Sequence, residues 1–141
     1  MTTPERLGKI TLPQGVRLVL NDRPEEGQSK SLRLGLAAAW GESYLFLNAD
    51  QPRLTPASLT PLFELAEENP RSIIYPTANG NPCAPALFPA RFRAQLLATT
   101  GDVGGRAVRI ANPDSCLTFA AQNPDDFADI DSPQDYRRIK K

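Results

Sequence analysis

The chain has 141 residues, with 16 Lys and Arg against 16 Asp and Glu, and it contains no His. This length suits one domain with a single hydrophobic core over residues 1–141. A net charge of zero argues against a nucleic acid as the main partner, because proteins that bind polyanions usually carry a basic excess. The absence of His excludes His-based catalytic triads, His general bases and His-ligated zinc or non-haem iron.

The cysteines and the apolar residues restrict the class of protein further. Cys83 and Cys116 are too few for a disulfide framework or a structural zinc site. Any metal would therefore have oxygen ligands, which favours Mg²⁺, Mn²⁺ or Ca²⁺. No apolar run approaches the ~20 residues that cross a bilayer, and the N-terminus lacks the apolar stretch of a signal peptide. We expect a cytoplasmic protein without a membrane partner.

The first third of the chain predicts a strand, a helix and a second strand. Residues 16–20 have the pattern of a short buried strand. Ser29 or Ser31 can cap a helix that runs to about Trp40, whose side chain would lie on the buried face. Residues 44–47 are the strongest strand signal, and their continuous apolar character suggests burial on both faces, as in a parallel sheet.

The middle of the chain predicts a helix followed by a strand. Thr55 is a capping residue followed by Pro at the first helical position, and Asn69 with the next Pro ends this helix. Residues 72–75 predict a short strand. Residues 76–85 are too rich in Gly and Pro for a regular element.

The last third predicts shorter elements and completes the fold. They are a strand at 86–88, a helix at 89–98, a flexible turn at 101–106, a strand at 116–119 and a helix from Ser132 to Lys141. Strands that alternate with helices at this spacing predict an α/β fold. We expect a three-layer α/β/α sandwich with a mostly parallel (mixed) sheet.

One acidic residue, Asp50, follows the strongest predicted strand. In open α/β sheets, ligands bind outside the carboxyl ends of the strands, and Asp50, Gln51 and Pro52 lie at that position. A carboxylate there can reach a crevice while the sheet fixes its backbone, which suits a metal ligand. The alternative is that Asp50 only caps a turn before Pro52.

Three further segments could contribute to a site. In the acidic segment 129–135, Asp131 could bind a metal or could cap the last helix, and its spacing leaves both roles open. The turn at 101–106 could form an anion-binding nest with added charge from Arg106. Residues 27–31 form a helix N-terminus that could receive a phosphate or hydroxyl group.

Taken together, five short motifs occur in a defined order across residues 16–138. They are Gly27 with Ser31 and Gly35-Leu36, then Asp50-Gln51-Pro52, then residues 83–88, then Gly101-Asp102 with Gly104-Gly105-Arg106, and last Asp129-Ile130-Asp131-Ser132-Pro133 with Asp135. In this order they resemble the later two-thirds of the MobA-like nucleotidyltransferases. The most similar branch is the molybdenum cofactor cytidylyltransferases, which usually show Asp-Gln-Pro, Gly-Asp-x-Gly-x-Arg and Asp-x-Asp-Thr-Pro-x-Asp.

The resemblance implies a nucleotide-diphospho-sugar-transferase-like fold and a transferase reaction. Family members join a nucleoside triphosphate, here CTP, to a phosphorylated acceptor such as molybdopterin and release pyrophosphate, with Mg²⁺ neutralising charge on the phosphates. Asp50 and Asp131 match the catalytic, metal-binding carboxylates. The residues that match positions beside the nucleotide or the acceptor are Gly27, Ser31, Gln51, Pro52, Gly101, Asp102 and Arg106.

The sequence departs from the family at its N-terminus. Members begin with a Leu-Ala-Ala-Gly-x-Ser-x-Arg-Met-Gly loop that holds the triphosphate, and here that loop is absent. Residues 6–9 are faintly similar to its end, but the favoured interpretation is a solvated N-terminal tail. The resemblance therefore predicts an N-terminally truncated domain that is weakly active or inactive alone. The alternatives are a non-catalytic binding or regulatory module, or a split subunit completed by another chain. A sheet that lacks its first strands also predicts a homodimer through the exposed edge.

Overall fold

The computed structural model describes residues 11–139, so residues 6–9 and Lys141 lie outside the described part. These residues form two compact units, each built from two stretches of the chain. One contains the chain up to Glu42 and Ala90–Pro113, and the other contains Ser43–Pro89 and the chain from Asp114. The single domain over residues 1–141 stays a prediction.

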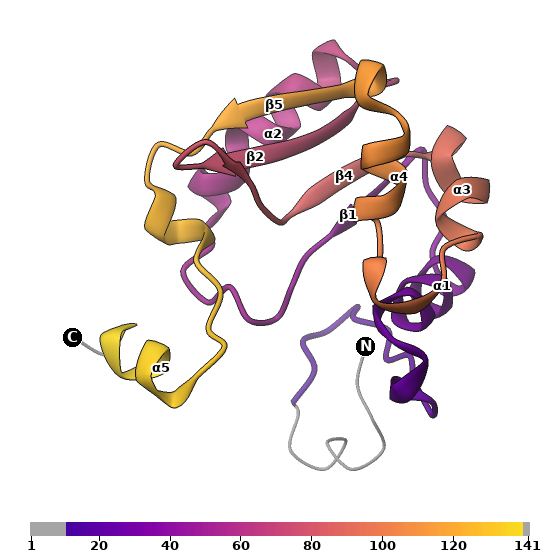
Figure 1. Ribbon diagram of the computed structural model, residues 1–141. Coiled ribbons are helices and arrows are strands. Elements are labelled where there is room, and N and C mark those ends of the chain that lie inside the picture. Colours follow the sequence, from indigo (N-terminus) through magenta and orange to yellow (C-terminus); the bar gives the residue numbers. More distant parts are fainter. Residues whose placement is uncertain (1–10, 140–141) are drawn as a thin grey trace. The chain divides into compact units, whose positions relative to one another are not determined.

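A five-stranded mixed sheet forms the centre of the second unit (Figure 1). Its strands are β1 (Ser43–Phe46), β2 (Ile73–Ala78), β3 (Asn81–Pro82), β4 (Ala86–Pro89) and β5 (Cys116–Ala120). The order is β1-β4-β2-β3, and β5 pairs with β2. Only the β2–β5 pairing is parallel, and the other three are antiparallel. Because β4 runs opposite to both of its neighbours, β1, β2 and β5 point in the same direction, which confirms the predicted α/β fold with a mixed sheet.

The core of this unit forms where helix α2 (Pro56–Glu68) packs on the sheet. Leu62 of α2, Ile74 of β2 and Leu87 of β4 are buried together. Thr55 caps the helix as predicted, since its side chain accepts a hydrogen bond from the Ser58 N–H and the Ser58 side chain accepts one from the Thr55 N–H. Apolar side chains from α2 and from the strands β1, β2, β4 and β5 thus pack together in one core.

The prediction of an irregular segment at 76–85 is partly wrong. Strand β2 continues through Pro76 to Ala78, and β3 returns beside it after a turn at Asn79 and Gly80. Both turn residues have positive φ, 51° and 79°, which is the conformation that tight hairpin turns require. The Asn-Gly pair was the sequence signal for this hairpin, and the surrounding prolines masked it.

The unit that contains residues 11–42 is helical in its described part. Its elements are α1 (Gln28–Ala38), α3 (Arg93–Leu97) and α4 (Arg106–Ala111), with 3₁₀ turns η2 (Pro24–Glu26), η3 (Ala90–Phe92) and η4 (Gly101–Val103). Helix α1 packs against α3 and η4 and buries Leu32 and Leu36. The guanidinium groups of Arg17 and Arg93 donate to carbonyl oxygens in its last turn, where such groups are otherwise unpaired.

Two predictions for this unit are wrong. Residues 16–20 form no strand beyond a single bridge residue at Leu20, and Val16 and Leu20 are 52% and 44% exposed. A short apolar run becomes a strand only when a neighbour pairs with its backbone, which the run itself does not reveal. Trp40 was predicted to lie on the buried face of α1, but the helix ends at Ala38. Trp40 is therefore outside the helix, and its side chain is 87% exposed.

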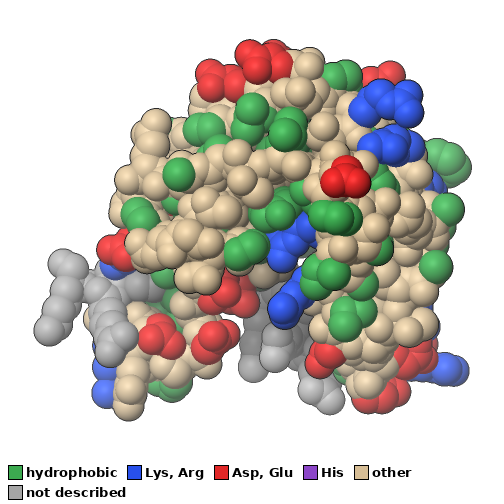
Figure 2. All heavy atoms as spheres, turned by 45° about the horizontal axis from the view of Figure 1, so that its top comes forward, with side chains coloured by type: hydrophobic (Ala, Val, Ile, Leu, Met, Phe, Trp, Pro, Cys, Tyr) green, Lys and Arg blue, Asp and Glu red, His purple; other side chains and the backbone are tan. Residues whose placement is uncertain are grey.

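The remaining elements of the described part are short, and its surface carries both signs of charge. They are η5 (Pro113–Ser115), η6 (Pro124–Phe127) and α5 (Pro133–Ile139). On the face drawn in Figure 2, acidic and basic side chains both occur and hydrophobic side chains lie in small groups. Within residues 11–139, no helix has the length and hydrophobicity to span a membrane.

Candidate functional site

The Asp-Gln-Pro motif lies in the turn between β1 and α2, where the sequence predicted it. Gln51 is 5% exposed, whereas Pro52 is exposed. The Gln51 side-chain N–H₂ donates to two carbonyl oxygens, those of Ala84 at 3.1 Å and Phe127 at 2.9 Å. These two acceptors determine the orientation of the amide, since a flipped amide would place its oxygen beside two other oxygens. Gln51 therefore ties this turn to the segment before β4 and to η6.

The acidic segment after η6 lies against the same turn. The backbone N–H of Ile130 donates to the carbonyl oxygen of Asp50 at 2.9 Å. Asp129 and Asp131 flank Ile130, so the structure places the segment that carries Asp131 beside Asp50. It also adds Asp129, for which the sequence analysis gave no role.

Asp129 has the clearest electrostatic perturbation in this cluster. Its pKa is raised, first because neighbouring protein atoms displace water from the carboxyl group, and then because Asp50 and Asp131 are negatively charged. The Gln51 side chain acts in the opposite direction and lowers this pKa. The Asp-x-Asp spacing was the signal for Asp129, since residues two apart point to the same side of an extended segment.

The carboxylates fit a divalent cation. Asp50 Oδ1 is buried and has no hydrogen-bond partner, which is costly for a charged oxygen unless a cation or another donor completes it. Among residues 11–139, no group of three acidic or cysteine side chains is placed to hold a metal ion by itself. Mg²⁺ sites in nucleotide enzymes commonly use one or two carboxylates, and water and substrate phosphates provide the other ligands. Asp50 with Asp131 or Asp129 matches that pattern.

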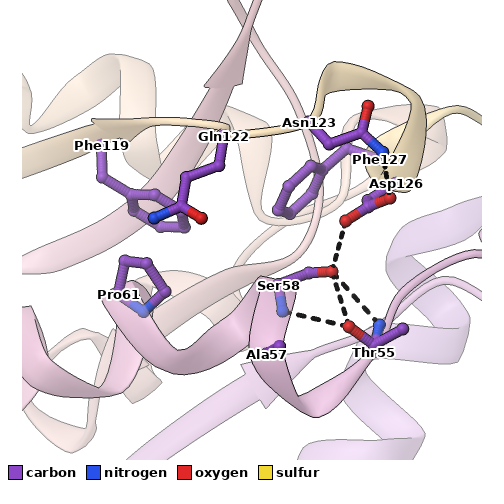
Figure 3. A pocket seen from close by; sticks show the side chains of 9 residues that line it. All are labelled: Thr55, Ala57, Ser58, Pro61, Phe119, Gln122, Asn123, Asp126 and Phe127. Atoms are coloured by element: carbon purple, nitrogen blue, oxygen red, sulfur yellow. Dashed lines mark hydrogen bonds between the residues drawn. The ribbon is translucent and has the colours of Figure 1, made fainter.

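Side chains that line a hollow between α2 and the β5–η6 connection help to hold the acidic segment in place (Figure 3). Ser58 Oγ donates to Asp126 Oδ2 at 2.7 Å, and Asn123 Nδ2 donates to Asp126 Oδ1 at 2.7 Å. The rings of Phe119 and Phe127 pack edge to face at 6.4 Å. Both oxygens of Asp126 accept hydrogen bonds, and these bonds fix η6 against α2. Because η6 ends two residues before Asp129, they also help to position the acidic segment.

The last helix is capped by Ser132 and not by Asp131. Ser132 Oγ accepts a hydrogen bond from the Asp135 N–H at 3.2 Å, and Asp135 Oδ2 accepts one from the Ser132 N–H at 3.0 Å. This reciprocal pair is a capping box. The alternative that Asp131 caps this helix is therefore wrong, and its carboxylate is not used in the cap.

Two of the predicted glycine motifs lie against each other in the unit that contains α1. Asp102 Oδ1 accepts a hydrogen bond from the N–H of Gln28 at 2.9 Å, and Ser29 Oγ donates to the Gly101 carbonyl at 2.6 Å. A Cβ at Gly27 would lie 2.8 Å from the backbone of Gly101. A carboxylate thus already caps the N-terminus of α1, the position at which the sequence predicts a possible phosphate or hydroxyl site.

Of the other predicted binding residues in this unit, Ser31 has a hydrogen-bond partner within the protein and Arg106 is exposed. Ser31 Oγ accepts a hydrogen bond from Asn21 Nδ2 at 3.0 Å, so its hydroxyl already has an internal partner. Arg106 begins α4 and is exposed, beside a hollow that Val103 and Ile110 also line. The structure thus gives Gly27, Ser31, Gly101 and Asp102 contacts within the protein, and their binding role stays a prediction.

We predict that Gly27→Ala destabilises the protein more than Gly15→Ala. Both glycines have a φ of +84°, so both variants are strained, but only Gly27 faces backbone within 3 Å. We expect the free energy of unfolding to fall by about 1–3 kcal/mol more in Gly27→Ala, the usual cost of overpacking. Denaturant unfolding of both variants measures this difference, and equal losses would contradict the close contact.

We also predict that Asp129→Asn stabilises the metal-free protein at pH 7. Because the folded pKa of Asp129 is raised, its contribution to stability is complete below the usual value of 3.8 and is lost as the pH rises through the folded pKa. The variant should therefore unfold at a higher temperature than the parent at pH 7 and at the same temperature near pH 3. Asp114→Asn, at an exposed position, is the control and should show no such pH dependence.

Comparison with known proteins agrees with the motif pattern. The family model described as "MobA-like NTP transferase domain" matches residues 1–115, a range that includes the Asp-Gln-Pro turn and both glycine motifs. The predicted resemblance to the MobA-like nucleotidyltransferases is thereby confirmed. A comparison with curated proteins gives no significant match.

Several solved structures share this fold. Rv0371c from Mycobacterium tuberculosis is 21% identical with a TM-score of 0.76, and the similarity covers 98% of this chain and 73% of that chain. The structure of Rv0371c in complex with manganese is 20% identical with a TM-score of 0.73, and the similarity covers 98% of this chain and 75% of that chain. A nucleotidyl transferase from Methanothermobacter thermautotroptrophicus is 23% identical with a TM-score of 0.71, and the similarity covers 96% of this chain and 64% of that chain.

At these identities the solved structures establish the fold, and membership rests on the family match. That match covers well over half of the chain. The chain therefore belongs to the MobA-like NTP transferase family.

Proposed function

We propose that the protein transfers a nucleotide from a nucleoside triphosphate to a phosphorylated acceptor and releases pyrophosphate. CTP is the proposed nucleotide and a molybdopterin-like compound is the proposed acceptor, as the motif resemblance implies. The observation that supports this proposal best is the unpartnered, buried Oδ1 of Asp50 beside the segment that carries Asp129 and Asp131. Such an arrangement suits a cation that binds phosphate groups.

Asp50 and Asp131 are the residues that would hold Mg²⁺, and Asp129 would add negative charge to the same cluster. When bound, the ion would neutralise charge on the reacting phosphates. The protein's own contribution is to place these carboxylates at one point and to keep them there. A phosphate acceptor is already ionised at neutral pH, so the absence of His is compatible with this chemistry. The manganese complex of the similar M. tuberculosis protein supports a divalent cation.

A non-catalytic binding module, or a subunit completed by another chain, is the alternative function. The observation that favours it is the internal use of the predicted substrate contacts. Asp102 caps α1, and the hydroxyls of Ser29 and Ser31 bind Gly101 and Asn21. Asp102 Oδ1 and the hydroxyl proton of Ser29 would have to leave these partners before they could bind a substrate.

We predict that Asp50→Asn abolishes Mn²⁺ binding, because the variant loses the charge of the carboxylate whose oxygen has no other partner. A titration of the purified chain followed by paramagnetic relaxation of water protons measures this binding. Asp114→Asn removes one negative charge at an exposed position and should bind Mn²⁺ like the parent. Unchanged Mn²⁺ binding in Asp50→Asn would refute the proposed cation site.

Release of pyrophosphate distinguishes the two functions. The chain would be incubated with Mg²⁺, a molybdopterin acceptor and each nucleoside triphosphate in turn, with Asp50→Asn as the background. Release above that background, highest with CTP, supports a transferase. Binding of Mn²⁺ and CTP without release supports the binding module.

We further propose a homodimer formed through β1. In the described part of the chain, β1 has only β4 as a neighbour, and Leu47 just beyond it is 54% exposed. Unpaired strand edges readily add another strand.

Light scattering at micromolar concentration should give twice the mass of one chain. Leu47→Lys should reduce this mass, whereas Phe63→Lys, at an exposed position of α2, should not. A monomeric parent would contradict the dimer.

A further inference from the structure

Gln51 uses its side chain differently from a residue that binds substrate. Its side chain is almost fully buried, and both of its N–H groups donate to backbone carbonyls of distant segments. Its Oε1 is buried without a partner. Since an apolar side chain of the same length would avoid that unpaired oxygen, the two donated hydrogen bonds account for an amide at this position.

The two hydrogen bonds act on the segments that carry the carboxylates. Gln51 follows Asp50 directly, and its acceptor Phe127 precedes Asp129 by two residues. The backbone bond from Ile130 to Asp50 lies beside this link. Like charges repel, so three carboxylates gathered here tend to separate when no cation is bound. The donated hydrogen bonds of Gln51 oppose that separation.

We infer that Gln51 is a positioning residue that holds Asp50 against the segment of Asp129 and Asp131 before a cation binds. This inference rests on the proposed cation site. Gln51 raises the affinity for the cation because the ligands are already in place and no ordering is needed on binding. It does so without itself being a ligand.

The test compares Gln51→Met and Gln51→Asn with Gln122→Met in the full chain. Gln51→Met keeps the length of the side chain but donates no hydrogen bond, and Gln51→Asn is too short to reach both carbonyls. Gln122→Met makes the same change at an exposed glutamine of the same unit. Mn²⁺ alone is the probe, with affinity measured by water-proton relaxation and ligation by the electron paramagnetic resonance spectrum of the bound ion.

We expect Gln51→Met to weaken Mn²⁺ binding about 10- to 100-fold, as is common for residues that orient metal ligands. Gln51→Asn should fall between this variant and the parent, and Gln122→Met should match the parent. The spectrum of the bound ion should change in Gln51→Met, although its metal-free unfolding remains cooperative.

A folded Gln51→Met with Mn²⁺ affinity within about twofold of the parent would overturn the inference, because a preorganising contact has a larger effect. If both Gln51 variants fail to fold, Gln51 maintains the fold as a whole and is not a positioning residue. A parent chain that does not bind Mn²⁺ would instead refute the proposed cation site itself.

Discussion

The side-chain amide of Gln51 is the contact on which the acidic cluster depends. It donates to carbonyls on two segments, one before β4 and one at the end of η6. With these bonds in place, the N–H of Ile130 reaches the carbonyl of Asp50, and the carboxylates on both sides come together. The pKa of Asp129 is raised in this arrangement, first because burial removes water from its carboxyl group and then because Asp50 and Asp131 carry like charge nearby.

The glycine motifs depend on a different constraint, which is the close approach of backbone to backbone. Gly27 leaves no room for a side chain beside Gly101, and the carboxylate of Asp102 caps the first turn of α1. Here the residues that define the family pattern build the structure of their own unit. In the acidic cluster, by contrast, the buried Oδ1 of Asp50 has no hydrogen-bond partner. For this reason we assign the proposed function to the carboxylates and not to the glycine motifs.

Much of the fold could be predicted from local signals. Thr55 followed by Pro marked the start of α2, and the apolar run before Asp50 marked β1. The expected burial of this run on both faces is wrong, because β1 is an edge strand in the described part of the chain and Leu47 is 54% exposed. Residues 16–20 were misread because strand formation depends on a pairing partner, which lies elsewhere in the chain. The position of Asp50 followed from the sheet, whereas the role of Gln51 depends on carbonyls of distant residues that no local pattern specifies.

The Gln51–Phe127 hydrogen bond joins residues that are 76 positions apart, so the site is assembled only when nearly the whole chain is present. Contacts over such separations close late in folding, because the entropy of the intervening loop must be lost first. During synthesis, the Asp50 turn leaves the ribosome long before its partners. Metal binding by this cluster would therefore report completion of the fold, and a nascent chain that ends before the acidic segment would lack the site.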